Sequence, residues 1–324
     1  MCFLRGVLDI PPAICCDLSG RGRLRVTGKD RTRFLNGQVT NDVKSLPPGQ
    51  GCYALFTHAN GKIRADAVVL NMGDSLWVDL EAGHDRRIAS DLEKFVIADD
   101  VEIENLTVSW SAFALVGHGS AELLRRSGLC AEPPGKPFKI SKISGGDFAE
   151  GLLFRSHRSV HDSFDVWVKL PPPGPLEKIL AKTIEQAHGK TADLSMLEIL
   201  RVEAGIPRFG SEMDENTLPQ EAGVEAIAVS YSKGCYIGQE VIARIKSRGR
   251  VNRTLVRLQL PPSAQPGDSL RYGDREVGRL GSAVTSSHFG RIGLAIVRRE
   301  AATPDTLLSL PQREARVVEN FISK

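Results

Sequence analysis

The feature that most constrains the fold of this chain is a change of sequence pattern near residue 251. Before this point, apolar runs with the period of β-strands alternate with runs that have the period of amphipathic helices. After it, short strand-like runs between residues 255 and 297 are separated only by turn sequences such as Pro-Gly and Gly-Asp. The pattern predicts an α+β region over residues 1–250 and an all-β domain, a small barrel, over residues 251–324.

A β-hairpin is predicted near the start of the first region. The apolar runs 52–57 and 63–70 flank the sequence His-Ala-Asn-Gly at 58–61, and an Asn-Gly pair favours a tight hairpin turn. A further strand is expected at residues 76–80. Apolar residues then recur at helical spacing over 88–96, which predicts a helix with one buried face.

The overall composition is that of a soluble protein. Forty-two Lys and Arg against 39 Asp and Glu leave a net charge of +3, which argues against a general nucleic-acid wrapper. No apolar run approaches the length of a membrane span, so we expect no membrane association. Six cysteines without a Cys-x-x-C pair predict reduced thiols in a cytoplasmic protein, and no metal site is expected.

The segment 233–240, Lys-Gly-Cys-Tyr-Ile-Gly-Gln-Glu, is a candidate reactive loop. Two glycines bracket Cys235, and the helix-like sequence that follows places the thiol ahead of a helix N-terminus. The helix dipole, together with Lys233 and Arg244, would favour the thiolate form. The alternative is that Cys235 is a small buried residue in a turn.

A local excess of positive charge surrounds this loop. Six of the residues from 233 to 253 are basic and one, Glu240, is acidic. Such a surface could hold an anionic small molecule, an acidic protein or a nucleic-acid phosphate, or be a solvated turn between domains. Without interleaved aromatic residues, RNA binding is the least favoured of these.

Residues 195–204 predict a helix that starts with a capping box of Ser195 and Glu198 and ends at Gly205. Glu203 lies in its last turn, where the helix dipole disfavours a carboxylate by roughly 0.3 to 1 kcal/mol. A carboxylate in this place suits the paired N–H donors of a pterin or guanine edge. The alternative is an exposed Glu at a frayed helix end.

Three stretches together resemble one protein superfamily. The loop 233–240, extended to Arg248-Gly249, resembles that of the folate-binding YgfZ-type proteins, which assist iron-sulfur cluster assembly and repair. Residues 200–207, Leu-Arg-Val-Glu-Ala-Gly-Ile-Pro, resemble a stretch that these proteins share with the T-protein, the aminomethyltransferase of the glycine cleavage system. The sequences around 34–43 and 60–63 resemble the N-terminal part of the same superfamily.

This resemblance implies a cloverleaf of three subdomains around a central tetrahydrofolate pocket, with two intertwined α+β subdomains before the C-terminal β-barrel. It implies two groups of site residues. Cys235 is the key thiol, supported by Lys233, Glu240 and Arg244, and the folate-binding residues are Glu203, Asp79, Asp66 and Arg201.

One departure from the T-protein pattern bears on the function. Where the T-protein has an Asp-Asp pair, this chain has Ala65 followed by Asp66, so the carboxylate that would act on the folate nitrogen is expected to be missing. The first hypothesis is therefore a tetrahydrofolate-binding factor that supports iron-sulfur proteins as clients or assembly partners. The alternative is a folate-dependent aminomethyltransferase that uses Asp66 and a lipoyl-carrier partner.

Overall fold

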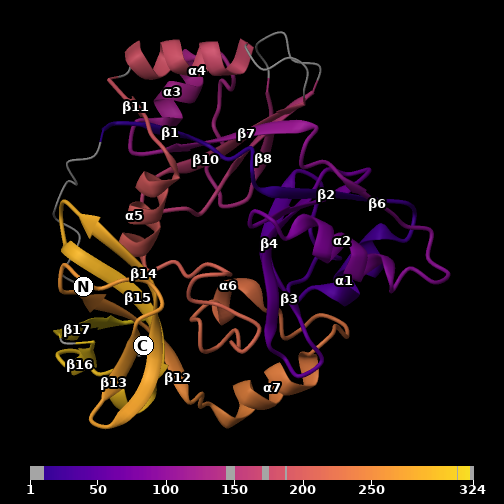
Figure 1. Cartoon of the computed structure of the whole chain (residues 1–324). Helices are drawn as coiled ribbons and strands as arrows, with labels where there is room; N and C mark the ends of the chain where they lie inside the picture. The colour runs from indigo at the N-terminus through magenta and orange to yellow at the C-terminus, as the bar shows by residue number, and fades with distance from the viewer. Residues whose placement is uncertain (1–10, 144–149, 170–174, 187, 312, 322–324) are drawn as a thin grey trace.

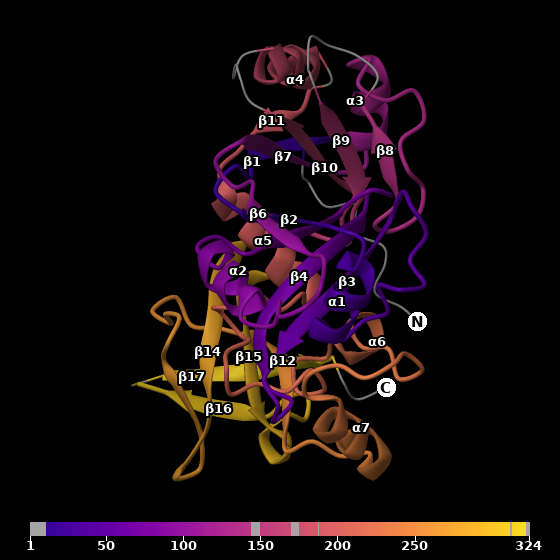
Figure 2. The ribbon, with the colours of Figure 1, turned by 90° about the vertical axis from the view of Figure 1, so that its right-hand side faces the viewer.

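The structure is a computed structural model that describes residues 11–143, 150–169, 175–186, 188–311 and 313–321. It consists of two antiparallel-rich sheets with their helices and a C-terminal β-barrel, arranged around a common centre (Figure 1). Figure 2 shows that the two sheets lie one above the other, with the barrel below them. The expected α+β fold with three parts and a C-terminal barrel is confirmed.

The first sheet has the strand order β3-β4-β5-β2-β6 among the described residues. Its apolar face is covered by the two helices α1 and α2. The hairpin expected around residues 58–61 joins β3 to β4. The elements are β2 (Gly22–Thr27), α1 (Arg31–Gln38), β3 (Gln50–Thr57), β4 (Ile63–Asn71), β5 (Leu76–Leu80), α2 (Asp85–Glu93) and β6 (Glu102–Asn105).

The second sheet has the order β11-β1-β7-β10-β9-β8, and α3 and α4 pack against it. Because β1 precedes the whole first sheet in the chain and β7 follows it, the two sheets are intertwined. The elements are β1 (Ile14–Asp17), β7 (Trp110–Val116), α3 (Ser120–Arg126), β8 (Ile140–Lys142), β9 (Gly151–Arg155), β10 (Ser163–Lys169), α4 (Pro175–Gln186) and β11 (Lys190–Thr191).

Three tryptophans join the two sheets. Trp77 of β5 meets Trp110 of β7 edge to face at 4.7 Å between ring centroids, and it stacks on Trp167 of β10 at 6.1 Å. All three rings are buried in one apolar cluster. Aromatic pairs of this geometry stabilise by about 0.5–1.5 kcal/mol beyond area burial, so they fix the sheets relative to each other.

The C-terminal strands close into a barrel of order β12-β15-β14-β13-β16-β17 within the described residues. The longest strand of the barrel is β14, whose pairing with β15 shifts between Leu280 and Ser282. The elements are β12 (Arg253–Gln259), β13 (Ser269–Tyr272), β14 (Arg275–Ser286), β15 (Gly290–Arg298), the short 3₁₀ helix η1 (Arg299–Ala301), β16 (Leu307–Leu310) and β17 (Arg313–Asn320).

Three helices connect the sheets to the barrel: α5 (Leu194–Ala204), α6 (Glu225–Ala228) and α7 (Gln239–Arg248). The expected capping box at the start of α5 is wrong, because the helix begins at Leu194 and the side chain of Asp193 accepts from the Ser195 N–H. Gly205 ends α5 with φ +69°, as expected for a helix stop. Helix α5 contacts both β1 and the barrel strand β14, so it links the second sheet to the barrel.

Candidate functional site

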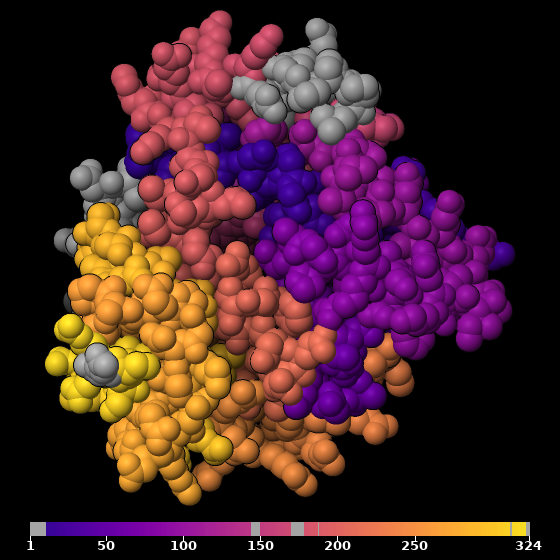
Figure 3. All heavy atoms as spheres, in the orientation of Figure 1, coloured from indigo at the N-terminus to yellow at the C-terminus, as the bar shows by residue number. Residues whose placement is uncertain are grey.

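A cavity of about 450 Å³ lies where the two sheets and the barrel meet. Figure 3 shows the surface hollowed at this junction. Its walls come from β3, β4 and β5, from the loops after β1 and β9, from α5 and the loop behind it, and from the barrel. This volume is within the usual range of sites for small organic ligands.

The carboxylate of Asp66 is the most unusual group in this cavity. Its residue is 8% exposed, the Tyr53 hydroxyl donates to its Oδ2 at 3.0 Å, and its Oδ1 is buried without a hydrogen-bond partner. Burial raises the pKa of Asp66 to about 7, and the negative charge of Glu81 adds to the shift. A carboxyl group with this pKa exchanges a proton readily near neutral pH.

The pleat of β4 decides which of its side chains reach the cavity. Successive side chains of β4 point to opposite faces of the sheet, and Ala65 and Ala67 pack into the apolar core under α1 and α2. Asp66 and Val68 therefore face the cavity. Asp66, which the alternative hypothesis from the sequence used as the catalytic group, thus reaches the cavity, whereas residue 65 lies on the other face of the sheet.

Asp79 also lines the cavity, but its charge is already paired. The Nε of Arg21 donates to Oδ1 of Asp79 at 3.1 Å and to Oδ2 at 3.0 Å, and its Nη2 donates to Oδ2 at 2.8 Å. Arg21 also forms an ion pair with Glu81. The side chain of Asp79 is 1% exposed, and Arg158, which pairs with Asp165, lies 3.7 Å away. Burial alone would raise the pKa of Glu81, but the cation of Arg21 outweighs it and lowers that pKa.

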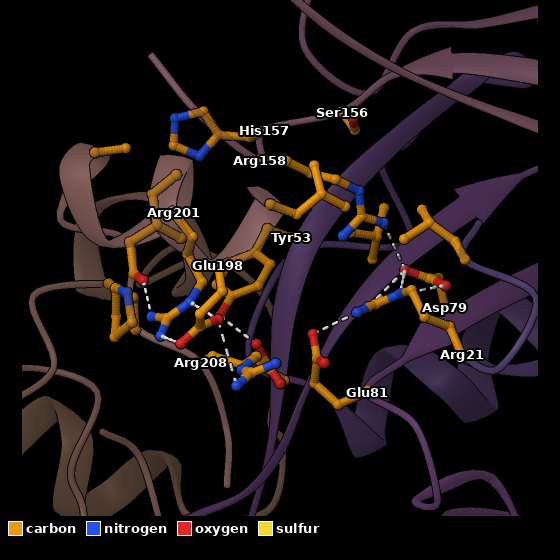
Figure 4. A pocket seen from close by; sticks show the side chains of 18 of the residues that line it. Arg21, Tyr53, Asp79, Glu81, Ser156, His157, Arg158, Glu198, Arg201 and Arg208 are labelled. Carbon is orange, nitrogen blue, oxygen red and sulfur yellow. Dashed lines mark hydrogen bonds and ion pairs between the residues drawn. The ribbon is translucent and has the colours of Figure 1, made fainter. Parts of the chain in front are cut away.

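Helix α5 supplies a carboxylate and a cation on the opposite wall of the cavity. Figure 4 shows Glu198, Arg201 and Arg208 there, facing Arg21, Asp79 and Glu81. Arg201 donates to Glu198, to Glu212 at 2.9 Å and to Ser282 of the barrel. Most of its hydrogen-bonding capacity is thus spent within the protein, which ties α5 to the barrel.

Glu203 is not among the described residues that line the cavity, although its neighbours Ala204 and Gly205 are. Its side chain is buried, Oε2 has no hydrogen-bond partner, and its backbone carbonyl accepts from Arg257 of β12. The carboxylate that α5 presents to the cavity is instead Glu198.

The loop with Cys235 lies outside the lining of this cavity. Lys233 is buried, and its Nζ donates to the backbone carbonyls of Asn36, Val39 and Asn41 at 2.6 to 2.7 Å. Those three bonds use all the hydrogens of the ammonium group, so Lys233 anchors the loop to the end of α1 rather than serving the thiol.

Cys235 itself is exposed, and the other described cysteines are buried or half-buried. The interpretation of Cys235 as a small buried residue is therefore wrong. Glu240 and Arg244 lie exposed on α7, beyond the loop. Gly238 has φ +88°, and an added Cβ would lie 2.5 Å from the carbonyl oxygen of His58, so this glycine lets the loop pack against the β3–β4 turn.

Several cavity residues were not anticipated from the sequence. One sequence signal could have found some of them. A charged residue within or beside an otherwise apolar strand, such as Asp79, must find a buried partner. Arg21 and Glu81 adjoin such strands, whereas contacts between distant segments carry no local signal. The unanticipated polar and charged residues are Asp17, Arg21, Tyr53, Glu81, Ser156, His157, Arg158, Glu198 and Arg208.

Within the part of the chain that the structure describes, no group of three or more His, Cys, Asp or Glu side chains could hold a metal ion. None of the described helices is both long and apolar enough to cross a bilayer.

The chain is similar in sequence to known transferases. It is 28% identical over 301 residues to a putative chloroplastic transferase of Arabidopsis thaliana, covering 90% of this chain and 66% of that protein, slightly less than two thirds. It is 28% identical over 289 residues to an aminomethyltransferase of Rubrobacter xylanophilus, covering 88% and 76%.

A similar fold occurs in the glycine cleavage system aminomethyltransferase T of Bartonella henselae. That crystal structure superposes with a TM-score of 0.83 at 18% identity and covers 96% of this chain and 86% of its own. The family model described as the GCVT N-terminal domain matches residues 12–233, well over half of the sequence. The chain therefore belongs to the GCVT N-terminal domain family.

Proposed function

We propose that this protein binds a reduced folate, tetrahydrofolate, in the central cavity and that Asp66 serves one-carbon transfer of the aminomethyltransferase type. The observation that carries the proposal is the buried carboxylate of Asp66, which lies in the cavity wall and whose Oδ1 has no hydrogen-bond partner within the protein. Relatives named aminomethyltransferase support the same interpretation.

The residues of the cavity suit such a ligand. A pterin edge offers N–H donors, and the Oδ1 of Asp66 and the carboxylate of Glu198 are acceptors. The rings of Tyr53, Phe154 and Phe321 provide apolar surface for planar groups. Arg208, whose side chain is 39% exposed, could meet the anionic glutamate end of folate. Asp79 and Arg201 would shape the same site through their ion pairs.

The chemistry that the protein would supply is a proton transfer. Two folate amines replace the sulfur and the nitrogen on the transferred carbon of the aminomethylated lipoyl donor. Two C–N bonds form, the C–S bond and the donor's C–N bond break, and the lipoyl thiol and ammonia leave. Each folate amine loses one proton, and the carboxylate of Asp66 accepts such a proton and passes it to a leaving group. Tyr53 holds the carboxylate by its hydrogen bond to Oδ2, and Oδ1 has no hydrogen-bond partner within the protein. General-base catalysis of this kind contributes typically ~10² to 10⁴-fold in rate.

A second candidate is the YgfZ-type role, in which the folate-binding protein supports assembly or repair of iron-sulfur proteins through Cys235. The specific observation in its favour is that Cys235 is exposed on a loop that Lys233 and Gly238 hold in place. Glu240 and Arg244 would then contact the partner protein from the exposed surface of α7.

One set of measurements separates the two candidates. We would titrate the purified protein with tetrahydrofolate and assay methylenetetrahydrofolate formation from an aminomethylated lipoyl donor. The first candidate predicts turnover that Asp66→Asn abolishes and Cys235→Ser retains. Folate binding without turnover, together with loss of an iron-sulfur enzyme's activity in cells carrying only Cys235→Ser, would favour the second.

A further inference from the structure

Phe321 lines the cavity from the barrel side, although it lies far outside the segment 12–233 that the family model matches. It directly follows the last barrel strand, β17, and its backbone N–H donates to the carbonyl of Leu255 in β12 at 3.2 Å. Leu255 lines the cavity as well. The barrel therefore contributes an aromatic wall to the proposed folate site.

The ring of Phe321 is held from two directions. An added Cβ at Gly205 would lie 2.2 Å from both Cε1 and Cζ of the ring, so the ring edge lies directly against the backbone that ends α5. The guanidinium of Arg257 lies over the ring with 5.2 Å to its centroid, and that guanidinium is itself held by Glu319 and by the carbonyl of Glu203. Such contacts restrict the ring to one orientation.

The position of this ring also connects it with the proposed proton-transfer group. Phe321 and Tyr53 both pack against one apolar cluster, which includes Val224 and Leu255 of the cavity wall. The hydroxyl of Tyr53 donates to Asp66. The apolar wall made by the barrel is therefore continuous with the residue that orients the carboxylate.

We propose that Phe321 is a ligand-contacting residue that packs against a planar ring of the bound folate and limits the depth of the cavity on the barrel side. This inference rests on the proposed folate binding. Aromatic rings stacked on planar heterocycles typically contribute enough affinity that their removal is measured as a loss of about tenfold.

The test compares Phe321→Ala with Phe289→Ala by calorimetric titration with tetrahydrofolate. Phe289 is a matched control, because Arg257 also lies over its ring, at 5.3 Å, yet Phe289 is 38% exposed and is not among the cavity-lining residues. We expect Phe321→Ala to weaken binding about tenfold or more and Phe289→Ala to leave it within about twofold. Each variant loses one ring from Arg257, so the comparison cancels that loss.

The outcomes distinguish this inference from the proposed function. Suppose that the wild-type protein binds tetrahydrofolate, that Asp66→Asn weakens this binding and that Phe321→Ala does not. Then only the proposed role of Phe321 is overturned. If the wild-type protein does not bind tetrahydrofolate, the proposed function fails and this inference with it. Should Phe321→Ala not fold, as judged by circular dichroism and thermal unfolding, Phe321→Leu replaces it, and affinity equal to wild type would then contradict the proposal.

Discussion

Replacing Asp66 by asparagine should change how the stability of this protein depends on pH. The pKa of Asp66 rises from the ordinary 3.8 to about 7 in the folded protein, mainly because the group is buried and secondly because Glu81 is near. Between about pH 4 and pH 7, therefore, the folded protein holds a proton on Asp66 that the unfolded chain has already released. The stability from this proton is fully present below the unfolded pKa and is lost as pH rises through 7.

The size of the effect follows from these two pKa values. Between pH 5 and pH 8 the wild-type protein should lose roughly 2 to 3 kcal/mol of unfolding free energy through this one group. The amide of the Asp66→Asn variant does not titrate, so this variant should escape that loss. For a chain of this length the melting temperature of the variant relative to wild type should rise by about 4 °C over the same pH range.

Differential scanning calorimetry at intervals between pH 5 and pH 8.5, without ligand, measures this directly. The quantity to compare is how the difference in melting temperature between variant and wild type changes with pH, because other effects of the substitution shift this difference by a constant amount. Asp74→Asn, which alters a carboxylate on the surface, controls for the exchange of an acid for an amide. A difference between Asp66→Asn and wild type that stays constant within about 1 °C would refute the buried, protonated Asp66.

Three further predictions concern single residues. Glu198→Gln should weaken tetrahydrofolate binding about tenfold, whereas Glu203→Gln should leave it within about twofold, because only Glu198 lines the cavity; equal losses in a titration would contradict this assignment. Ala65→Asp should destabilise the fold by ~3 kcal/mol or more, since it puts a carboxylate into the core under α1 and α2; a melting temperature like that of wild type would show that residue 65 reaches solvent or the cavity. Lys233→Met should cost ~2 kcal/mol or more, because three backbone carbonyls lose their donor; unchanged thermal unfolding would disprove the anchoring role.

Local patterns in the sequence were sufficient for much of the fold. The Asn60-Gly61 turn, the strand Leu76–Leu80 and the barrel turns were all predicted where the structure has them, because each depends on residues close together in the chain. Several strands were not predicted, among them β1, β8, β9 and β11. They are short, and their stability comes from pairing with distant partners, as when Ile14 pairs with both Lys190 and Val116.

The site was less predictable than the fold, for a physical reason. Asp66, Asp79 and Arg201, which the resemblance named as folate-binding residues, line the cavity. Which face of β4 lies toward the cavity is decided by the pleat of the sheet and not by the identity of residue 65. Glu198 and Glu203 lie five positions apart on one helix, so they point in different directions. Only the packing of α5 against the sheets and barrel shows which of them reaches the ligand site.

We expect this cavity to bind a reduced folate through the carboxylate of Asp66. Isothermal titration calorimetry of the wild-type protein and Asp66→Asn with tetrahydrofolate, under reducing conditions at pH 7.5, tests it most directly. We expect saturable one-to-one binding by the wild type and an affinity about tenfold or more lower for the variant, because the amide cannot reproduce the charge-assisted hydrogen bond. Equal affinity of the two proteins, or no binding by either, would contradict it.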